Sequence, residues 1–297
     1  MTNLRGQAVL IVLLSMVVVL TIVLSVIGSS TSDISLGTTE SASLRAFSAA
    51  ESGIEKSLVT NLATSGNVNS GASYDASVIS LAQGAKSYIY PQSIVNGDGA
   101  TFWFVSHDAA TQNLTCAAGN TCFTGKAVNF CWGIPGTSGS SATTPALEIS
   151  VFYLNTPGNY TTTRVGKDVY DPNSSRRSTN NYNSTDSGTC TIGNTTFAFQ
   201  KKVDLSTNSH FGVSSSAYNA VNGLQFMIVK PLYSVVAEPI GIDVNYAGNG
   251  SLPAQGSLVS STGNQGQTTR KIEVTRAYNQ VPPIFDVAIF SPGGLVQ

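Results

Sequence analysis

The sequence predicts an α+β protein, with one long N-terminal α-helix followed by a β-rich globular head. Three observations support this fold class. Residues 8–28 form an uncharged apolar run, residues 29–62 continue with apolar positions three and four apart, and residues 74–297 contain short apolar or alternating runs separated by Gly, Asn, Ser and Pro. The expected organisation is a leader at 1–6, a helix at 7–62, a linker at 63–73 and a head at 74–297.

The apolar run has the length of a membrane-spanning helix. Ala8–Gly28 counts 21 residues, and at about 1.5 Å per residue it would match a bilayer core of about 30 Å. Its polar members, Ser15, Thr21 and Ser25, carry hydroxyls that bond to carbonyls of the preceding turn. We therefore expect one transmembrane segment at residues 8–28.

The helical pattern continues past this segment. A secretory signal peptide would have a shorter hydrophobic core, of about 7–15 residues, followed by a cleavage site. Residues 29–62 contain no proline. The apolar residues proposed to pack this second, amphipathic half of the helix are Phe47, Ala50, Ile54 and Leu58.

Two motifs in these first 60 residues resemble a known family. A short basic leader ends at Gly6, and the opening Gly6–Ile11 reads GQAVLI. The later segment Arg45–Leu58 reads RAFSAAESGIEKSL. Together they are similar to the N-terminus of PilX/GspK-type minor pilins and pseudopilins, the family of the type IV pilus assembly PilX N-terminal domain.

The resemblance implies a structural, non-enzymatic role. A prepilin peptidase would cleave the leader between Gly6 and Gln7. The helix would lie in the membrane and then pack against other pilin subunits, while the head would be extracytoplasmic, at the cell surface or the pilus tip. Such a subunit initiates, primes or caps a type IV pilus or a type II secretion-like pseudopilus.

Ile11 departs from the pattern of major pilins. Those subunits carry Glu at the fifth residue of the mature chain, where it neutralises the N-terminal amine of a neighbour, and counting from Gln7 this position is Ile11. The family tolerates the absence of Glu in subunits at the filament tip, so Ile11 is proposed to determine filament position. The alternative is that Ile11 is one more apolar residue of a membrane anchor.

The pattern in the rest of the chain predicts mainly β-strands and few helices. A short helix is expected at Tyr74–Gln83 and a final strand at Pro282–Phe290. The clearest strand segments are Thr101–Ser106, Lys126–Gly133, Ala146–Leu154, Thr196–Val203, Gln225–Val229, Ile240–Tyr246 and Arg270–Ala277. Tyr170–Thr189 is expected to be a long polar loop.

Four cysteines suggest two disulfides in an exported domain. Cys116 and Cys122 bracket a Gly-Asn turn, which makes a short clip the easiest closure, and Cys131 would then pair with Cys190 and fasten the polar loop to a core strand. Free thiols and a zinc site are the competing interpretations, although no Cys-x-x-Cys pair is present.

Composition excludes some partners. Charged residues make up 10% of the chain and the formal net charge is −1, against about 25% charged residues in ordinary soluble domains. This balance provides no electrostatic surface for nucleic acid. No cofactor motif is recognised, because Gly119–Lys126 lacks the spacing of a phosphate-binding loop and has Ala127 where Ser or Thr is needed.

Two weaker sites remain in the head. Asp168, Asp171, Asn173 and Asp186 offer oxygen ligands for calcium, but their spacing matches no defined loop and Arg176 and Arg177 oppose a cation. His107 and Asp108 could orient as an acid–base pair, without any nucleophile motif beside them. The alternatives to a pilin are therefore a single-pass anchored surface protein or adhesin and, third, an envelope enzyme that uses His107.

Overall fold

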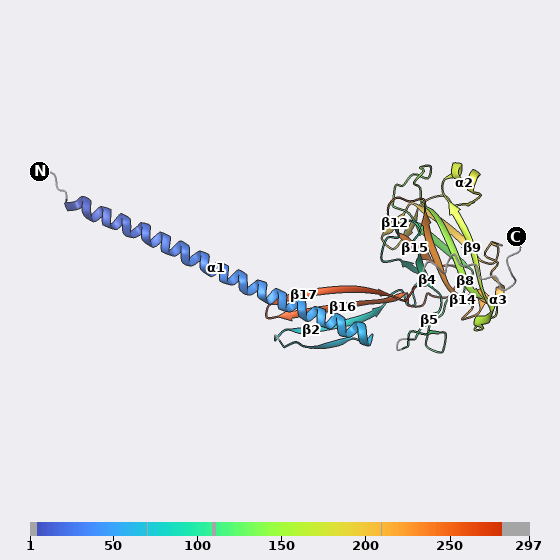
Figure 1. The fold of residues 1–297 in the computed structure, drawn as a ribbon, viewed down its shortest axis with the longest axis horizontal. Helices are drawn as coiled ribbons and strands as arrows, with labels where there is room; N and C mark the ends of the chain where they lie inside the picture. The colour runs from blue at the N-terminus through green and yellow to red at the C-terminus, as the bar shows by residue number, and fades with distance from the viewer. Residues whose placement is uncertain (1–4, 70, 109–110, 209, 281–297) are drawn as a thin grey trace. The chain divides into compact units, whose positions relative to one another are not determined.

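A computed structural model describes residues 5–69, 71–108, 111–208 and 210–280. It confirms the α+β class, with one long helix followed by a strand-rich globular part (Figure 1). The chain divides into two compact units. The helix unit comprises residues 1–78 and 259–274, and the head unit comprises residues 79–258 and 275–297.

Helix α1 runs from Arg5 to Thr60 without a break, over 56 residues. It ends because Asn61 adopts a left-handed backbone with φ 54°, and its N–H donates to the carbonyl of Ser57 at 2.8 Å. The expected helix at 7–62 is therefore confirmed to within two residues at each end.

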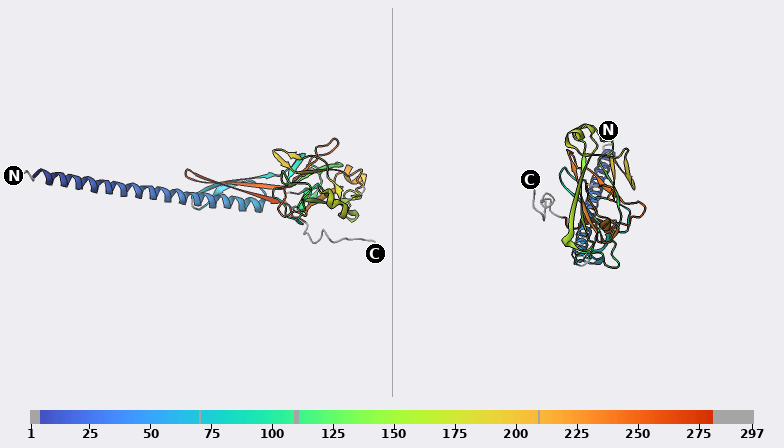
Figure 2. Two further views of the ribbon diagram at one scale, coloured as in Figure 1. Left: turned by 90° about the horizontal axis from the view of Figure 1, so that it is seen from above. Right: turned by 90° about the vertical axis from the view of Figure 1, so that its right-hand side faces the viewer.

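The helix unit pairs this helix with one four-stranded sheet. The strand order is β1 (Thr64–Asn67), β2 (Ser73–Ser80), β16 (Gly256–Gln265) and β17 (Thr268–Ala277). Figures 1 and 2 both show the C-terminal half of α1 lying along this sheet. A small cluster of Ala49, Ala72 and Tyr74, with Val68 packed against it, forms a core between helix and strands.

Small residues let the helix approach the sheet closely. The buried face of α1 consists of Ala46, Ala49, Ala50, Gly53, Ile54 and Ser57, spaced three and four apart. Opposite it, Gly263 of β16 lies so close that a Cβ there would overlap the carbonyl of Ala46 and come within 2.6 Å of the Ala50 nitrogen. No larger side chain fits between these backbones.

Two expectations for residues 63–83 are wrong. Residues 63–73 are not a linker, because Thr64–Asn67 pair antiparallel with β2 and Gly71, at φ 78°, shapes the turn of that hairpin. Tyr74–Gln83 is not a helix, because Tyr74 and Ala76 point to the buried face while Asp75 and Ser77 are exposed. Such alternation of buried and exposed side chains is typical of a β-strand, and α1 covers one face of this strand.

The expected head boundary at residue 74 also changes. Most of β2 belongs to the helix unit, and residues 259–274 return to it from far along the chain. The physical reason is that the amphipathic half of α1 needs an apolar surface to cover it, and β2 alone is too narrow. Residues of β16 complete the cover, with Ser261 against Gly53 and Gly263 against Ala46 and Ala50.

The head unit is built on two sheets, one of five strands and one of four. The first has the order β10 (Asn183–Ser184), β9 (Thr163–Asp171), β8 (Ala146–Leu154), β14 (Leu224–Leu232) and β4 (Ala100–Trp103). The second has the order β13 (Phe199–Asp204), β7 (Ala127–Trp132), β15 (Ile240–Asp243) and β3 (Ser87–Ile89). Side chains of both sheets, including Phe102, Ile149, Phe130, Trp132 and Ile242, share one core.

Shorter elements complete the head unit. They are the hairpins β5 (Ser106–His107) with β6 (Leu114–Thr115) and β11 (Cys190–Ile192) with β12 (Thr195–Phe197), the 3-10 turn η1 (Tyr160–Thr162), and the helices α2 (Ser174–Asn180) and α3 (Ser215–Asn219). The seven expected strand segments all overlap observed strands. The expected final strand at Pro282–Phe290 lies outside the described residues.

The expected polar loop at Tyr170–Thr189 is partly wrong. It contains α2, which begins because the Asn173 side chain accepts hydrogen bonds from the Ser175 and Arg176 backbone N–H groups, each at 3.1 Å. Asn181 ends this helix in a left-handed conformation, with φ 57°. Local capping side chains thus give structure to a segment whose composition is typical of a loop.

The close approach of helix and sheet makes Gly53 sensitive to substitution. A Cβ at Gly53 would overlap Ser261 Oγ and lie 2.8 Å from Tyr74 Cδ2. We expect Gly53→Ala to lower the free energy of unfolding by about 1–3 kcal/mol, since overpacking forces backbone shifts. Thermal unfolding of the full chain in detergent, followed by circular dichroism, measures this.

Gly37 of the same helix is the matched control, because a Cβ there meets nothing within 4 Å. Gly37→Ala is expected to leave the helix unit intact and to favour the helix by about 0.5–1 kcal/mol. Equal destabilisation by both substitutions would contradict the packing described for Gly53.

Candidate functional site

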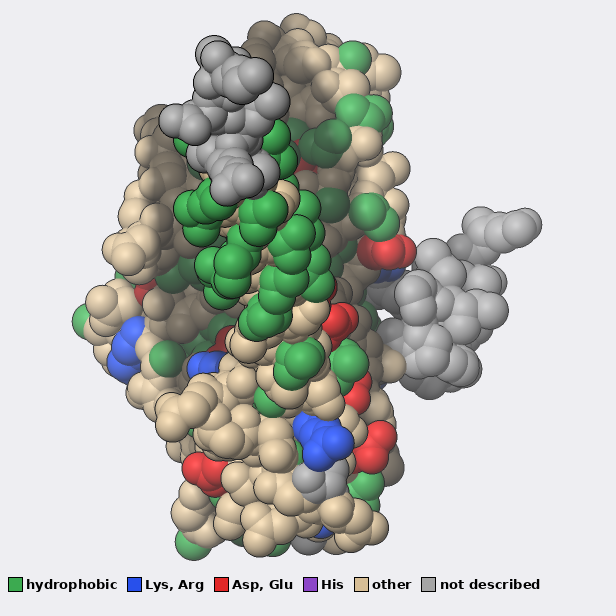
Figure 3. Space-filling view, turned by 90° about the vertical axis from the view of Figure 1, so that its left-hand side faces the viewer, with side chains coloured by type: hydrophobic (Ala, Val, Ile, Leu, Met, Phe, Trp, Pro, Cys, Tyr) green, Lys and Arg blue, Asp and Glu red, His purple; other side chains and the backbone are tan. Residues whose placement is uncertain are grey.

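The N-terminal half of α1 has the properties of a membrane span. Within the described residues it is the one helix long and apolar enough to cross a bilayer, and its most apolar window is 0% buried. Figure 3, viewed from the side on which α1 begins, shows these hydrophobic side chains uncovered. Ser15 Oγ and Thr21 Oγ1 donate to the carbonyls of Val12 and Val18, each at 2.8 Å, as expected from the sequence.

The predicted cleavage and position residues all belong to this half. Gly6 and Gln7 lie in the first turns of α1, and leader residues 1–4 lie outside the described residues. Ile11 is 63% exposed and has apolar neighbours along the helix. Its side chain therefore faces outward, toward whatever surrounds the helix.

The four predicted packing residues fall into two groups. Ala50 and Ile54 are buried within the helix unit, against its own sheet, while Phe47 remains 46% exposed and Leu58 is half-buried. The sequence pattern placed all four on one stripe. The buried face is instead turned toward Ala46, Ala49 and Gly53, because small residues permit the closer helix–sheet contact.

Because the buried face differs from the expected stripe, an apolar edge remains exposed on the second half of α1. Leu44 is 65% exposed and Phe47 lies one turn further along the helix. Phe47 is 46% exposed, so both side chains keep apolar surface outside the core of the helix unit. Hence the amphipathic half packs one face against its own sheet and keeps a narrower apolar edge exposed.

Both predicted disulfides are present. Cys116 pairs with Cys122 across 6 residues, and Cys131 pairs with Cys190 across 59 residues, with Cα–Cα distances of 5.7 Å in each pair. Cys131 lies in β7 and Cys190 in β11, so the second bridge joins the short hairpin to a core strand. No thiol remains free among the four cysteines.

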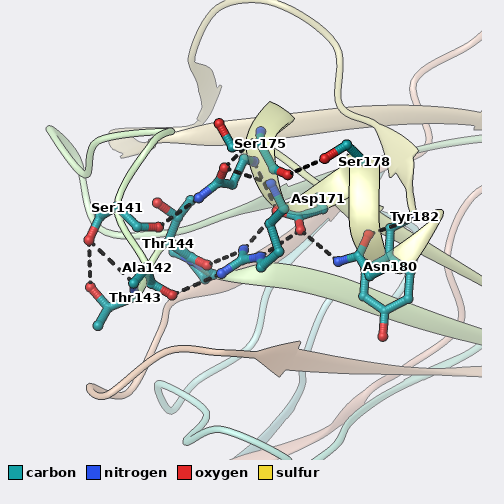
Figure 4. Close-up of polar contacts among 12 residues, drawn as sticks. Ser141, Ala142, Thr143, Thr144, Asp171, Ser175, Ser178, Asn180 and Tyr182 are labelled. Carbon is teal, nitrogen blue, oxygen red and sulfur yellow. Dashed lines mark hydrogen bonds and ion pairs between the residues drawn. The ribbon is translucent and has the colours of Figure 1, made fainter.

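The carboxylates proposed as calcium ligands do not converge. Asp171 is fully buried and pairs with Arg176, whose Nε and Nη2 donate to the two carboxylate oxygens at 2.7 Å each (Figure 4). Asn180 Nδ2 and the backbone N–H of Asn173 donate to the same carboxylate. The guanidinium therefore occupies the position that a cation would need.

Arg176 is itself almost fully engaged. Its Nη1 donates to the carbonyl of Ala142 at 2.9 Å and its Nη2 to that of Thr144 at 2.7 Å, and the guanidinium lies 3.9 Å from the ring centre of Tyr233. Burial raises the pKa of Asp171, but the hydrogen bonds from Arg176, Asn173 and Asn180, together with the charge of Arg176, outweigh it and hold this pKa below its usual value. The arrangement ties α2 to the loop before β8.

Asp168 and Asp186 lie in separate networks. Tyr170 Oη donates to Asp168 at 2.6 Å and Asn183 Nδ2 donates to its other oxygen at 2.6 Å, at the edge of an open cavity of about 310 Å³. Asp186 instead pairs with Lys201 at 2.9 Å. Within the described residues no group of three His, Cys, Asp or Glu side chains is arranged to hold a metal.

His107 sits in an aromatic cluster. Its ring stacks on Tyr278 with centres 3.7 Å apart and meets Trp103 edge-on at 4.5 Å. Burial lowers the pKa of His107 to about 4, so the ring is neutral at pH 7 and a weak base there. The carboxylate of Asp108 accepts hydrogen bonds from the backbone and hydroxyl of Thr111.

Comparison of the chain with family models, curated proteins and solved structures yields no match. The function must therefore be argued from the residues themselves. The features that carry most of that argument are the uncovered half of α1, its attachment to the sheet, and the motifs at Gly6–Ile11 and Arg45–Leu58.

Sequence reasoning missed two parts of this arrangement. It did not identify Gly263 and Ser261 as the surface that receives α1, since 200 or so residues of chain separate them from the helix. It noted Arg176 only as an obstacle to cation binding. The Asp-x-x-x-x-Arg spacing of Asp171 and Arg176 around the helix-capping Asn173 was the available signal.

Removing the guanidinium of Arg176 should destabilise the head unit strongly. In Arg176→Met the buried Asp171 carboxylate loses its cation, and such a loss lowers the free energy of unfolding by about 3–5 kcal/mol. Lowering the pH should narrow the difference from the wild type, since protonation neutralises the unpaired carboxyl in the variant but weakens the ion pair in the wild type.

The matched control is Lys126→Met, which breaks an exposed pair whose Nζ lies 3.9 Å from Asp204. Exposed pairs contribute about 1 kcal/mol or less. Urea unfolding of the full chain in detergent measures both variants. Similar losses for Arg176→Met and Lys126→Met would show that the Asp171 pair does not hold the head together.

Proposed function

We propose that this chain is a minor pilin or pseudopilin, a non-enzymatic subunit that initiates, primes or caps a type IV pilus or a type II secretion-like pseudopilus. The observation that carries the proposal is α1, one continuous 56-residue helix with an uncovered apolar half and a second half fixed to its own sheet. A subunit that first sits in a membrane and then packs in a helical filament needs both properties.

Other observations support the same role. The leader and the Gly6–Ile11 opening fit processing by a prepilin peptidase, and the block at Arg45–Leu58 resembles the second motif of the PilX-type family. Leu44 and Phe47 offer an apolar edge to the helices of other pilin subunits. Two disulfides fit an oxidising, extracytoplasmic location for the head, at the cell surface or the pilus tip.

Processing provides the first test. The mature protein should begin at Gln7, because the peptidase of this system cuts after glycine, and Gly6→Leu should leave the leader attached. Intact-mass measurement of protein purified from membranes and from filaments shows at which residue the mature protein begins. Retention of Met1 in assembled protein, or cleavage beyond Gly28, would support a single-pass anchored surface protein instead.

Ile11 provides the second test, which concerns position in the filament. Without a carboxylate to meet the amine of a subunit ahead of it, the protein should enter only at the start of a filament, in few copies. Immunogold labelling of sheared filaments should therefore mark one end or none. Dense regular label along the shaft would identify a major subunit and contradict the initiator role.

Substitution sharpens this second test. Ile11→Glu should permit some incorporation along the shaft, although a carboxylate in the membrane costs about 2.5–3.5 kcal/mol at insertion. Val12→Glu is the matched control, because Val12 is equally exposed on α1, with 64% against 63% for Ile11, and carries the same insertion cost at the wrong position. Equal labelling of the shaft by both variants would contradict a role specific to Ile11.

A further inference from the structure

The head carries six Asn-x-Ser/Thr sequences in which x is not proline. Their asparagines are Asn113, Asn159, Asn173, Asn183, Asn194 and Asn249. This tripeptide is the acceptor for N-linked glycosylation in exported proteins, and the reacting atom is the side-chain amide nitrogen Nδ2. Since the sequence alone cannot rank six sites, the surroundings of each amide decide.

Three of the six amides are engaged in the fold. Asn173 is 6% exposed and its Nδ2 donates to the carbonyl of Ser141 at 3.0 Å. Asn183 Nδ2 donates to Asp168 at 2.6 Å, and Asn249 Nδ2 donates to the carbonyl of Ala127 at 2.6 Å. A sugar on Asn173 would have no room beside a buried side chain. On Asn183 or Asn249 it would replace an N–H hydrogen of a nitrogen that makes two hydrogen bonds in the head unit.

Asn159 is different, because its amide is exposed and already oriented. Its Oδ1 accepts hydrogen bonds from the backbone N–H of Thr161 at 3.1 Å and from Thr161 Oγ1 at 2.7 Å. The hydroxyl of the tripeptide is therefore bonded to the asparagine side chain itself. Within the described residues Nδ2 makes no hydrogen bond, and Asn159, Tyr160 and Thr161 are all exposed.

The loop that presents Asn159 is held in one conformation. The hydroxyl of Thr162 donates to the carbonyl of Asn159 at 2.7 Å and that of Thr163 donates to the carbonyl of Tyr160 at 2.6 Å. The backbone N–H of Gly158 donates to the carbonyl of Asn222 at 3.1 Å. The hydroxyls of Thr162 and Thr163 thus fix the backbone of the loop. Of these three threonine hydroxyls, only that of Thr161 bonds to the side chain of Asn159.

The other two exposed asparagines lack this arrangement. In the Asn113 tripeptide, the Thr115 hydroxyl accepts a hydrogen bond from the Ala117 N–H at 3.2 Å. In the Asn194 tripeptide, the Thr196 hydroxyl faces that of Thr191 at 3.4 Å. Neither hydroxyl is bonded to its own asparagine. Asn159 is therefore the site at which exposure, a free Nδ2 and a correctly placed hydroxyl coincide.

We propose that Asn159 is an N-linked glycosylation site, which takes its sugar from a polyprenyl-diphosphate-linked donor. In this step Nδ2 forms a bond to the anomeric carbon of the sugar and loses one proton, while the bond from that carbon to the diphosphate oxygen breaks and the polyprenyl diphosphate leaves with the electron pair. The inference rests on the proposed extracytoplasmic location of the head. A sugar there would add hydration to a surface with few charges.

Peptide mapping by mass spectrometry tests the proposal on full-length protein purified from its native membranes. The peptide that contains Asn159 should be heavier by one or more sugar residues, and the peptides that contain Asn173 and Asn249 should have their unmodified masses. Thr161→Val should reduce occupancy of Asn159 at least tenfold, whereas Thr161→Ser, which keeps the hydroxyl, should retain it. Circular dichroism of each variant checks that the fold is kept.

The same spectra separate this inference from the proposed function. Protein that begins at Gln7, contains both disulfides and carries a bare Asn159 would overturn the glycosylation site and leave the pilin role standing. Retention of Met1 together with sugar on Asn159 would overturn the pilin role alone. Sugar found only at Asn113 or Asn194, or full occupancy in Thr161→Val, would also overturn the assignment to Asn159.

Discussion

The close contact between α1 and its own sheet is the constraint on which the helix unit depends. An isolated helix gains little from its own propensity, so most of its stability comes from packing. Here the packing uses backbone approach in place of large side chains, with Ala50 and Gly53 on the helix against Ser261 and Gly263 on β16. This contact holds the amphipathic half of α1 on a folded body and leaves the N-terminal apolar half uncovered.

The contact also determines which apolar residues of the amphipathic half stay exposed. Because Ala50 and Ile54 are buried inside the helix unit, the exposed large apolar side chains of this half are those of Ile34, Leu36, Leu44, Phe47 and Val59. These side chains and those of the N-terminal apolar half therefore lie exposed on a single element.

The head unit relies on a different kind of stabilisation. With charged residues at 10% of the chain, it uses a few buried polar networks, in which Asp171 with Arg176 and Asp168 with Asn183 satisfy carboxylates that could not otherwise be buried. These networks fix the segment after β9, and the disulfide from Cys131 to Cys190 fastens the next hairpin to β7. Hydroxyls and amides occupy the surface, which is where Asn159 is presented.

The sequence by itself determined the elements whose signals are local. Length and hydropathy gave α1, alternation gave the strands of the head, and the turn between Cys116 and Cys122 favoured the correct disulfide pairing. Only the tertiary structure decided that β1 and β2 form a hairpin against the helix, that β16 and β17 return to it, and that Arg176 neutralises Asp171. The return of β16 and β17 depends on contacts between residues about 200 positions apart in the chain. The hairpin and the ion pair join residues that are close in sequence, but each forms only because other parts of the fold bury it, and a short strand or a polar segment has no distinguishing local pattern. The neighbouring element that packs against a segment, more than the segment's own composition, then determines its conformation. The same packing determines which side chains stay exposed.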